Sequence, residues 1–274
     1  MFRFADEIID LPCPLPLPEK PDTATQADSQ QCLRYARTWL NVCQMDHIDC
    51  SLPGHIVQLP TRVLDITRTE PRLFVSDRQT GSYAALSYCW GTEGNLITRR
   101  DDLESFRAQI PSVNIPATIK DAIQVAKSLG FQYLWVDALC IIQDDPEDWE
   151  IESCLMAQVY GNADLVIAAS SAKNSQQGFL TQTRRHPQGS VYFYNKGDPS
   201  KPYCIKYGLG PSYQMTLDEG PLAKRAWAYQ EKILARRYLC YGPEELSWHC
   251  NAIETCECSY VLVLLGGVQQ KITR

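Results

Sequence analysis

Two carboxylates stand at positions where they could do chemistry. Glu152 falls in a helix predicted over 146–160, three residues after Trp149, on a stripe that is otherwise apolar. A carboxylate on such a stripe costs free energy unless it has a partner or a function. Asp137 follows a predicted buried strand at 133–136, and α/β folds place their sites at such strand ends. Asp137 and Glu152 are therefore two candidates for a pair of carboxylates that acts as acid and base.

Each carboxylate also has a structural explanation. Glu152 would be satisfied by an arginine or a backbone amide at the rim of its helix, since structural networks also perturb carboxylates. Asp137 would serve as a cap or as an anchor for the loop that follows its strand. The sequence does not give the separation of the two carboxyl groups, so both interpretations stay open.

Cysteine chemistry has weaker support. Cys89 and Cys140 could be nucleophiles, but a catalytic cysteine needs a base, and none of the 4 histidines lies in the central region 83–169. The 12 cysteines of this chain occur without an export signal, so we expect buried, reduced thiols rather than disulfides.

A cluster near the C-terminus raises the question of zinc. It comprises His249, Cys250, Cys256 and Cys258. Its spacing lacks the paired C-x₂-C ligands that structural zinc sites usually show. We therefore predict buried or loop thiols here and no metal site.

Aromatic and basic side chains supply the remaining candidates. Four tryptophans are expected to anchor the core, because each buries a large apolar area: Trp90, Trp135, Trp149 and Trp227. A last helix, predicted over about 222–236, carries Trp227, Gln230, Glu231 and Leu234 on one face. Its polar residues either lock the helix to the sheet or form a pocket wall in which Arg225 binds phosphate.

The elements that must position these residues alternate along the chain. Apolar strands are predicted at 84–88, 133–136 and 164–169, with helices between them, and Gly130 ends the first helix. Continuous apolar strands separated by helices predict an α/β fold with a short parallel sheet flanked by helices. We expect the residues after the strands, at 88–90, 137 and 170–171, to meet at one edge.

Further elements flank this core. Residues 10–30 are expected to form an extended lead-in, and a helix is predicted over 31–43. Residues 61–67 and 72–76 predict a strand pair, and 238–241 and 246–250 predict a β-rich C-terminal extension. These elements divide the chain into a lead-in with its helix (1–59), a strand pair (60–82), the α/β domain (83–232) and a C-terminal extension (233–274). We expect this last extension to be truncated.

Composition narrows the class of protein. The chain has 274 residues and a net charge of −6, from 26 basic and 32 acidic side chains, so a nucleic-acid partner is not expected. The longest apolar run is far shorter than the roughly 20 residues of a membrane span, and no secretory signal is evident, so we predict a cytoplasmic protein. The phosphate-binding and dinucleotide-binding glycine motifs are absent, as is H-E-x-x-H.

Several motifs together resemble one family. They are YAALSYCWG at 83–91, IPATI at 115–119 with DAI at 121–123, YLWVDALCIIQDD at 133–145, and RAWAYQE at 225–231. Along the helix after the third motif stand Trp149, Glu152, Met156 and Tyr160. In order and spacing these segments resemble the fungal heterokaryon incompatibility (HET) domain, which is distantly similar to TIR domains.

This resemblance implies a function and two mechanisms. HET domains act in fungal allorecognition, where a non-self signal leads to programmed cell death, a form of innate immunity. The first mechanism is signalling by assembly, with other HET-type or recognition proteins or a second copy as partners. The second is a TIR-like, assembly-activated cleavage of NAD, in which Glu152 and Asp137 are catalytic and NAD is the substrate. In a third alternative the short chain is inert or modulates a longer relative.

For the NAD-cleaving mechanism the resemblance also implies binding residues. They are Tyr88, Trp90, Trp149 and Arg225. No cofactor beyond NAD as substrate is implied.

Overall fold

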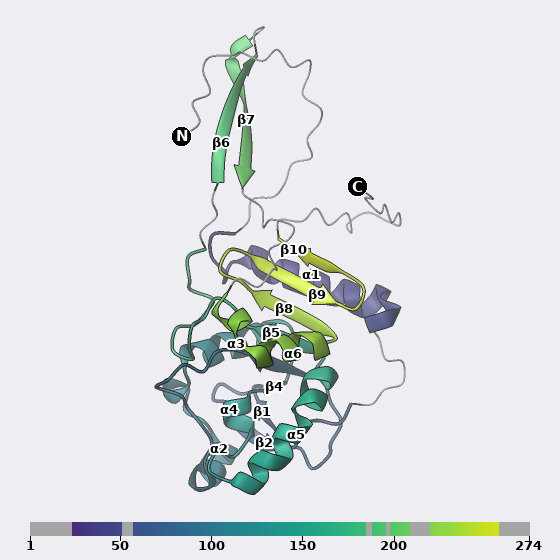
Figure 1. The fold of residues 1–274 in the computed structure, drawn as a ribbon, viewed down its shortest axis with the longest axis vertical. Coiled ribbons are helices and arrows are strands. Elements are labelled where there is room, and N and C mark those ends of the chain that lie inside the picture. The colour runs from purple at the N-terminus through teal and green to yellow at the C-terminus, as the bar shows by residue number, and fades with distance from the viewer. Residues whose placement is uncertain (1–23, 51–56, 185–187, 196–197, 209–219, 258–274) are drawn as a thin grey trace.

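The fold is that of a computed structural model, which describes residues 24–50, 57–184, 188–195, 198–208 and 220–257 (Figure 1). Its main element is an eight-stranded sheet with the strand order β10-β9-β8-β5-β3-β4-β1-β2. A separate two-stranded sheet consists of β6 (Gln188–Asn195) and β7 (Asp198–Gly208).

The centre of the large sheet is parallel. It comprises β3 (Tyr83–Ser87), β4 (Tyr133–Trp135), β5 (Leu165–Ala168) and β8 (Arg237–Tyr241). Every residue of β3, β5 and β8 is buried, as expected of strands covered on both faces. The spatial order β4-β3-β5-β8 places the second strand first, then the first, third and fourth, which is the flavodoxin-like winding. The predicted α/β fold with a short parallel sheet is confirmed.

Antiparallel strands extend this centre on both sides. On one side β1 (Arg62–Asp65) pairs with β4, and β2 (Arg72–Val75) pairs with β1. On the other side β9 (Leu246–Cys250) pairs with β8, and β10 (Glu254–Cys256) pairs with β9. The sheet is therefore mixed, and the predicted N-terminal strand pair and C-terminal β-rich extension both belong to it.

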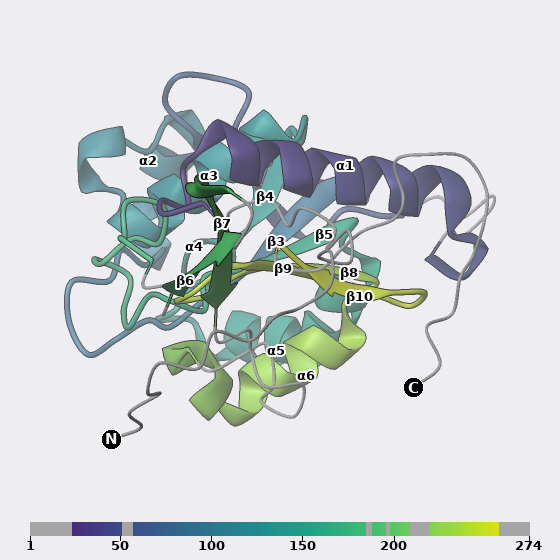
Figure 2. The same cartoon turned by 90° about the horizontal axis from the view of Figure 1, so that it is seen from above.

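Helices cover both faces of the sheet. Figure 2 shows α1 (Gln30–Asp46) and α3 (Ala117–Ser128) on one face and α5 (Pro146–Asn162) and α6 (Ala226–Leu234) on the other. Short helices complete the described chain: α2 (Leu103–Ala108), α4 (Asp137–Cys140), η1 (Ile48–Cys50), η2 (Arg100–Asp102), η3 (Ser112–Asn114) and η4 (Pro221–Lys224). None of these described helices is long and apolar enough to cross a membrane.

Local sequence explains where the long helices begin and end. The Asp145 side chain accepts hydrogen bonds from the backbone N–H of Glu147 and Asp148, and Pro146 occupies the first turn of α5. Ser29 caps α1 in the same way. After α3 the chain turns at Gly130, whose φ of 91° suits glycine.

Three expectations need correction. The last helix does not run unbroken over 222–236, because Arg225 adopts extended backbone between η4 and α6. Trp135 is fully buried as predicted, but Trp149 and Trp227 are not core anchors, being 54% and 67% exposed. Eight of the described cysteines form no disulfide, whereas Cys256 is disulfide-bonded, against the expectation of reduced thiols. Most of the predicted lead-in at 10–30 lies outside the described residues.

Candidate functional site

The carboxyl end of β4 delivers Asp137 to the start of α4. Its carboxylate accepts a hydrogen bond from Trp90 Nε1 at 2.8 Å and one from the backbone N–H of Ala138 at 2.7 Å. Trp90 follows β3, so the two motifs after adjacent parallel strands meet as predicted. Through these two bonds Asp137 anchors the loop after β3 to the start of α4, which is the structural role predicted for it.

Burial also shifts the pKa of Asp137. Loss of solvent raises the pKa of this carboxyl to about 6, although the bonds from Trp90 and Ala138 act to lower it. The buried Tyr88 hydroxyl lies near the same carboxyl but reaches no hydrogen bond of normal geometry. Asp137 therefore exchanges its proton close to neutral pH.

A second carboxyl faces the same space from α6. Glu231 accepts a short hydrogen bond from the hydroxyl of Ser87, the last residue of β3. Burial raises the pKa of Glu231 to about 7, the Ser87 bond lowers it, and the charge of Asp137 raises it again. Because both carboxyls titrate near neutrality and the charge of Asp137 acts on Glu231, one can be ionised while the other is protonated, as an acid and a base require.

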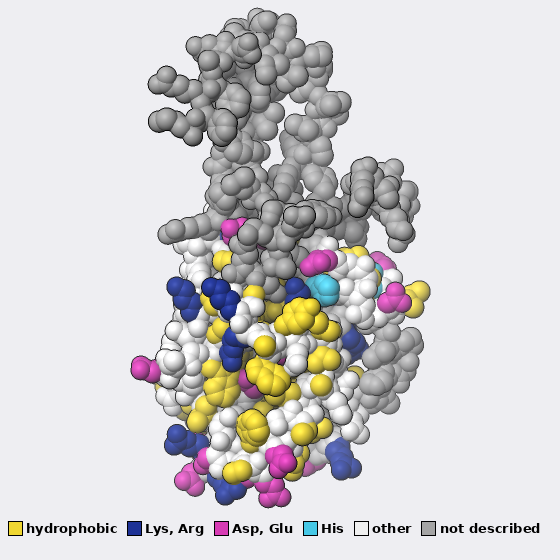
Figure 3. All heavy atoms as spheres, viewed as in Figure 1, with side chains coloured by type: hydrophobic (Ala, Val, Ile, Leu, Met, Phe, Trp, Pro, Cys, Tyr) yellow, Lys and Arg dark blue, Asp and Glu magenta, His cyan; other side chains and the backbone are white. Residues whose placement is uncertain are grey.

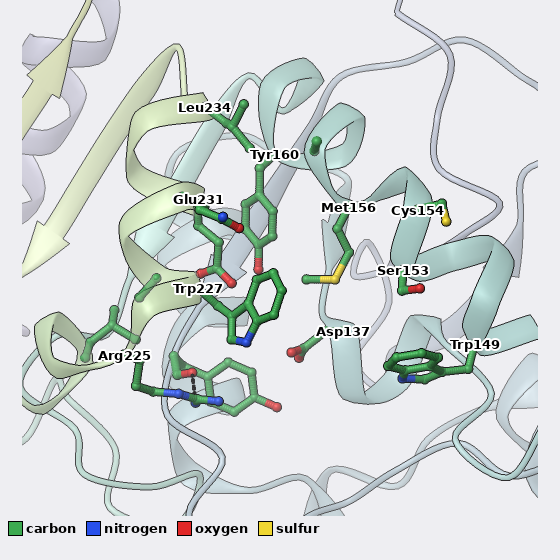
Figure 4. Close-up of a pocket in the computed structure, with 15 residues that line it drawn as sticks. Asp137, Trp149, Ser153, Cys154, Met156, Tyr160, Arg225, Trp227, Glu231 and Leu234 are labelled. Carbon is green, nitrogen blue, oxygen red and sulfur yellow. Dashed lines mark hydrogen bonds between the residues drawn. The ribbon is translucent and has the colours of Figure 1, made fainter. Parts of the chain in front are cut away.

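The two carboxyls lie in one pocket of about 480 Å³, between α5 and α6 (Figure 4). This volume falls within the roughly 300–1,000 Å³ of small-molecule sites. The pocket lies beyond the carboxyl ends of β3 and β4, beside β3, where the winding reverses and doubly wound folds bind their ligands. Its lining residues are Tyr88, Asp137, Trp149, Ser153, Cys154, Met156, Ala157, Tyr160, Leu222, Arg225, Trp227, Ala228, Gln230, Glu231 and Leu234.

The mouth of the pocket is aromatic and carries one cation. In Figure 4, Asp137 appears between the indole rings of Trp227 and Trp149. Arg225 donates from Nη1 to the carbonyl oxygen of Tyr88 at 3.0 Å, which fixes its position at the pocket wall. Figure 3 shows hydrophobic side chains gathered on this face, in agreement with the exposure of the two tryptophans.

Glu152 takes a different place. It is 3% exposed and does not line the pocket; its carboxylate lies 3.5 Å from Nη2 of Arg62. The same arginine binds Asp148 at 2.6 Å and the carbonyl oxygen of Cys140. Burial raises the pKa of Glu152, and a hydrogen bond from Thr61 and the charge of Arg62 lower it. These surroundings match the structural interpretation of Glu152, and the predicted pair with Asp137 is not brought together in the pocket.

Of the predicted binding residues, Tyr88, Trp149 and Arg225 line the pocket, while Trp90 acts through its bond to Asp137. Sequence reasoning missed a catalytic role for Glu231. The available signal is its place on the predicted helix face with Trp227, Gln230 and Leu234, and in the structure all four side chains line the pocket.

The two candidate cysteines are buried. Loss of solvent raises the pKa of Cys140 to about 12 and raises that of Cys89 above its ordinary value. Both thiols therefore stay protonated at neutral pH, which disfavours a thiolate nucleophile.

Comparisons with known proteins point to one family. Residues 83–231 match the family model described as "Heterokaryon incompatibility protein (HET)", and the pocket carboxyls lie inside this range. A curated protein of Neurospora crassa, "Heterokaryon incompatibility protein 6, OR allele", is 31% identical over 94 residues, which cover 31% of this chain. The matched part spans only 14% of the length of that relative. No solved structure matches the chain.

Proposed function

Because this chain belongs to the heterokaryon incompatibility (HET) family, we propose that it acts in heterokaryon incompatibility and that its pocket hydrolyses the N-glycosidic bond of NAD. The observation that carries the enzymatic part is the pair Asp137 and Glu231, two carboxyls of raised pKa in one pocket. Glu231 replaces Glu152 in this proposal, because Glu152 is held by Arg62 outside the pocket.

The pair fits the chemistry of the reaction. Breaking the bond between the ribosyl C1 and the nicotinamide nitrogen leaves neutral nicotinamide and a ribosyl group with oxocarbenium character. A carboxylate beside C1 stabilises that positive charge. Water then forms the new C1–O bond, and the second carboxylate accepts the proton that water loses. Asp137, with the lower pKa, is ionised more fully at neutral pH and suits the stabilising role, and Glu231 suits the role of base.

The rest of the pocket fits a dinucleotide. The indole rings of Trp149 and Trp227 offer apolar faces for flat heterocycles, and the Arg225 guanidinium offers a donor to phosphate. The raised pKa values of Asp137 and Glu231 reflect their limited contact with water, and a bound ligand would exclude the remaining water from the pocket.

The test is NAD hydrolysis by the purified full chain and NAD loss in an inducible host without related systems. We expect Glu231→Gln and Asp137→Asn to lower turnover by about 100-fold or more, the usual contribution of a general acid or base. Glu150→Gln changes an exposed glutamate of α5 and serves as the matched control. Full turnover in Glu231→Gln, or its loss in Glu152→Gln alone, would contradict the assignment.

A separate observation favours signalling by assembly as a second candidate. On α6 the side chains of Tyr229 and Ile233 are 66% and 63% exposed and do not line the pocket. Exposed apolar groups beside one another mark interaction surfaces, and a second copy of the chain is the partner we propose. Death that persists with constant NAD in Glu231→Gln, but stops in Tyr229→Asp, would favour assembly over catalysis.

A further inference from the structure

Three potential metal ligands are grouped at the end of α1. Cys43 lies in the last turn, His47 caps the helix, and Cys50 ends η1. Residues four apart on a helix share a face, so Cys43 and His47 point the same way. The backbone N–H of Cys50 donates to the His47 carbonyl oxygen at 3.1 Å, which turns the chain back toward the same point.

A fourth ligand comes from the far end of the sequence. Cys250 is the last residue of β9, and α1 packs against this strand (Figure 2). Its Sγ lies 3.4 Å from Nδ1 of His47. The three sulfur atoms and the imidazole nitrogen all lie within 4.8 Å of one another, and none of the three thiols is in a disulfide.

These distances nearly match a tetrahedral zinc site. With zinc–sulfur bonds of about 2.3 Å and a zinc–nitrogen bond of about 2.0 Å, neighbouring ligand atoms are roughly 3.5–3.8 Å apart. Movements of about 1 Å would bring the cluster to that geometry. We propose that Cys43, His47, Cys50 and Cys250 form a structural zinc site that joins α1 to the C-terminal strands of the sheet.

The surroundings supply charge compensation. Zinc with three thiolates and one neutral imidazole has a net charge of −1. The buried Arg237, opposite Cys250 in the register of β8 and β9, donates from Nε to Cys43 Sγ at 3.2 Å. Its Nη2 donates to the carbonyl oxygen of Cys50 at 3.0 Å, so one guanidinium orients two of the ligand residues. Such contacts around a metal centre position its ligands and balance its charge.

The ligand set indicates a structural rather than a catalytic role. Four protein ligands close a tetrahedron and leave no position for water or substrate. The three cysteines are buried and only His47 is partly accessible. The site belongs to the α1 face of the sheet, whereas the carboxyl pocket is on the α5 and α6 face, and so the zinc proposal stands apart from the proposed hydrolysis.

Sequence spacing alone does not indicate this site, because Cys250 is distant along the chain from the other three ligands. Of the cluster His249, Cys250, Cys256 and Cys258, only Cys250 takes part; Cys256 is disulfide-bonded and Cys258 lies outside the described residues. His249 points elsewhere, with Nδ1 3.9 Å from Glu254.

The test is the metal content of the full chain, purified under reducing conditions with zinc in the growth medium. Elemental analysis should find about one zinc per chain, with little zinc left in Cys50→Ser and Cys250→Ser. His47→Ala should lose zinc, and its matched control His249→Ala should keep it, as should Cys154→Ser at an exposed thiol. Zinc at the same level in Cys50→Ser, or none in the wild type, would overturn the proposal.

A second measurement covers variants that fail to fold. Cobalt(II) added to the metal-free wild type should give thiolate-to-cobalt charge-transfer absorption and the strong visible bands of tetrahedral cobalt. A zinc chelator should also expose three additional thiols to alkylation in the native wild type, and zinc in excess should protect them again. Octahedral cobalt spectra or an unchanged thiol count would refute the site.

Discussion

Replacing Glu231 with glutamine should stabilise the fold, and more so as the pH rises. The unfolded carboxyl titrates near 4.5 and the folded one near 7, so the folded protein binds this proton more tightly. The stability that the protonated group contributes is fully present below pH 4.5 and is lost as the pH rises through about 7. Glutamine stays neutral and can still accept the hydrogen bond from Ser87, so it avoids this loss.

The size of the effect follows from the pKa shift. A rise from 4.5 to about 7 corresponds to about 3 kcal/mol at 1.36 kcal/mol per unit. Solvent at the pocket mouth screens part of this free energy. We therefore expect Glu231→Gln to raise the free energy of unfolding by about 2 kcal/mol at pH 8 and by well under 1 kcal/mol at pH 5. For a chain of 274 residues, 2 kcal/mol corresponds to a rise in Tm of about 3–4 °C.

The assay is urea unfolding at both pH values, followed by tryptophan fluorescence. Glu150→Gln, at an exposed site on α5, controls for the general effect of removing one negative charge. A gain in stability of equal size at pH 5 and pH 8 would refute the reasoning, since it would come from packing rather than from ionisation. Destabilisation at pH 8 would show that the carboxylate is well solvated or paired in the folded protein.

Three further outcomes test the packing. Arg62→Met should destabilise the fold by about 3–5 kcal/mol in urea unfolding, because Asp148 and Glu152 would lose the cation that both contact. Trp135→Ala should cost about 3–5 kcal/mol and Trp227→Ala less than about 1 kcal/mol, a contrast that equal losses would contradict. Gly220→Ala should cost about 3 kcal/mol, since an added Cβ would overlap the Ser170 carbonyl oxygen; an unchanged Tm would show that the backbone there yields easily.

The central elements were predictable because each is specified locally. Asp145 and Pro146 mark the start of α5, Gly130 ends the turn after α3, and the buried strands read as continuous apolar runs. The meeting of Trp90 with Asp137 followed from parallel strands that end at one edge. These predictions needed periodicity and handedness alone.

The role of α5 could not be predicted in the same way. Helical spacing placed Trp149 and Glu152 on one stripe but does not say what covers each part of that stripe. In the structure β1 brings Arg62 to Glu152, while Trp149 remains half exposed at the pocket mouth. Both outcomes depend on long-range partners, the antiparallel strand β1 and helix α6, whose positions no local pattern encodes. The zinc ligands illustrate the same limit, because Cys250 joins Cys43 only through the fold.

The proposed hydrolysis and the proposed assembly both use residues of α6, and the weak attachment of this helix could couple them. This helix has no side-chain cap at its N-terminus, and Ala228 is its one buried residue. Its position depends on α5, on the bond from Ser87 to Glu231 and on the bond from Arg225 to Tyr88. Few buried contacts imply a low local free energy of opening. A second copy that covered Tyr229 and Ile233 would therefore hold Glu231 beside Asp137, so assembly at one face of α6 would favour the pocket on the other.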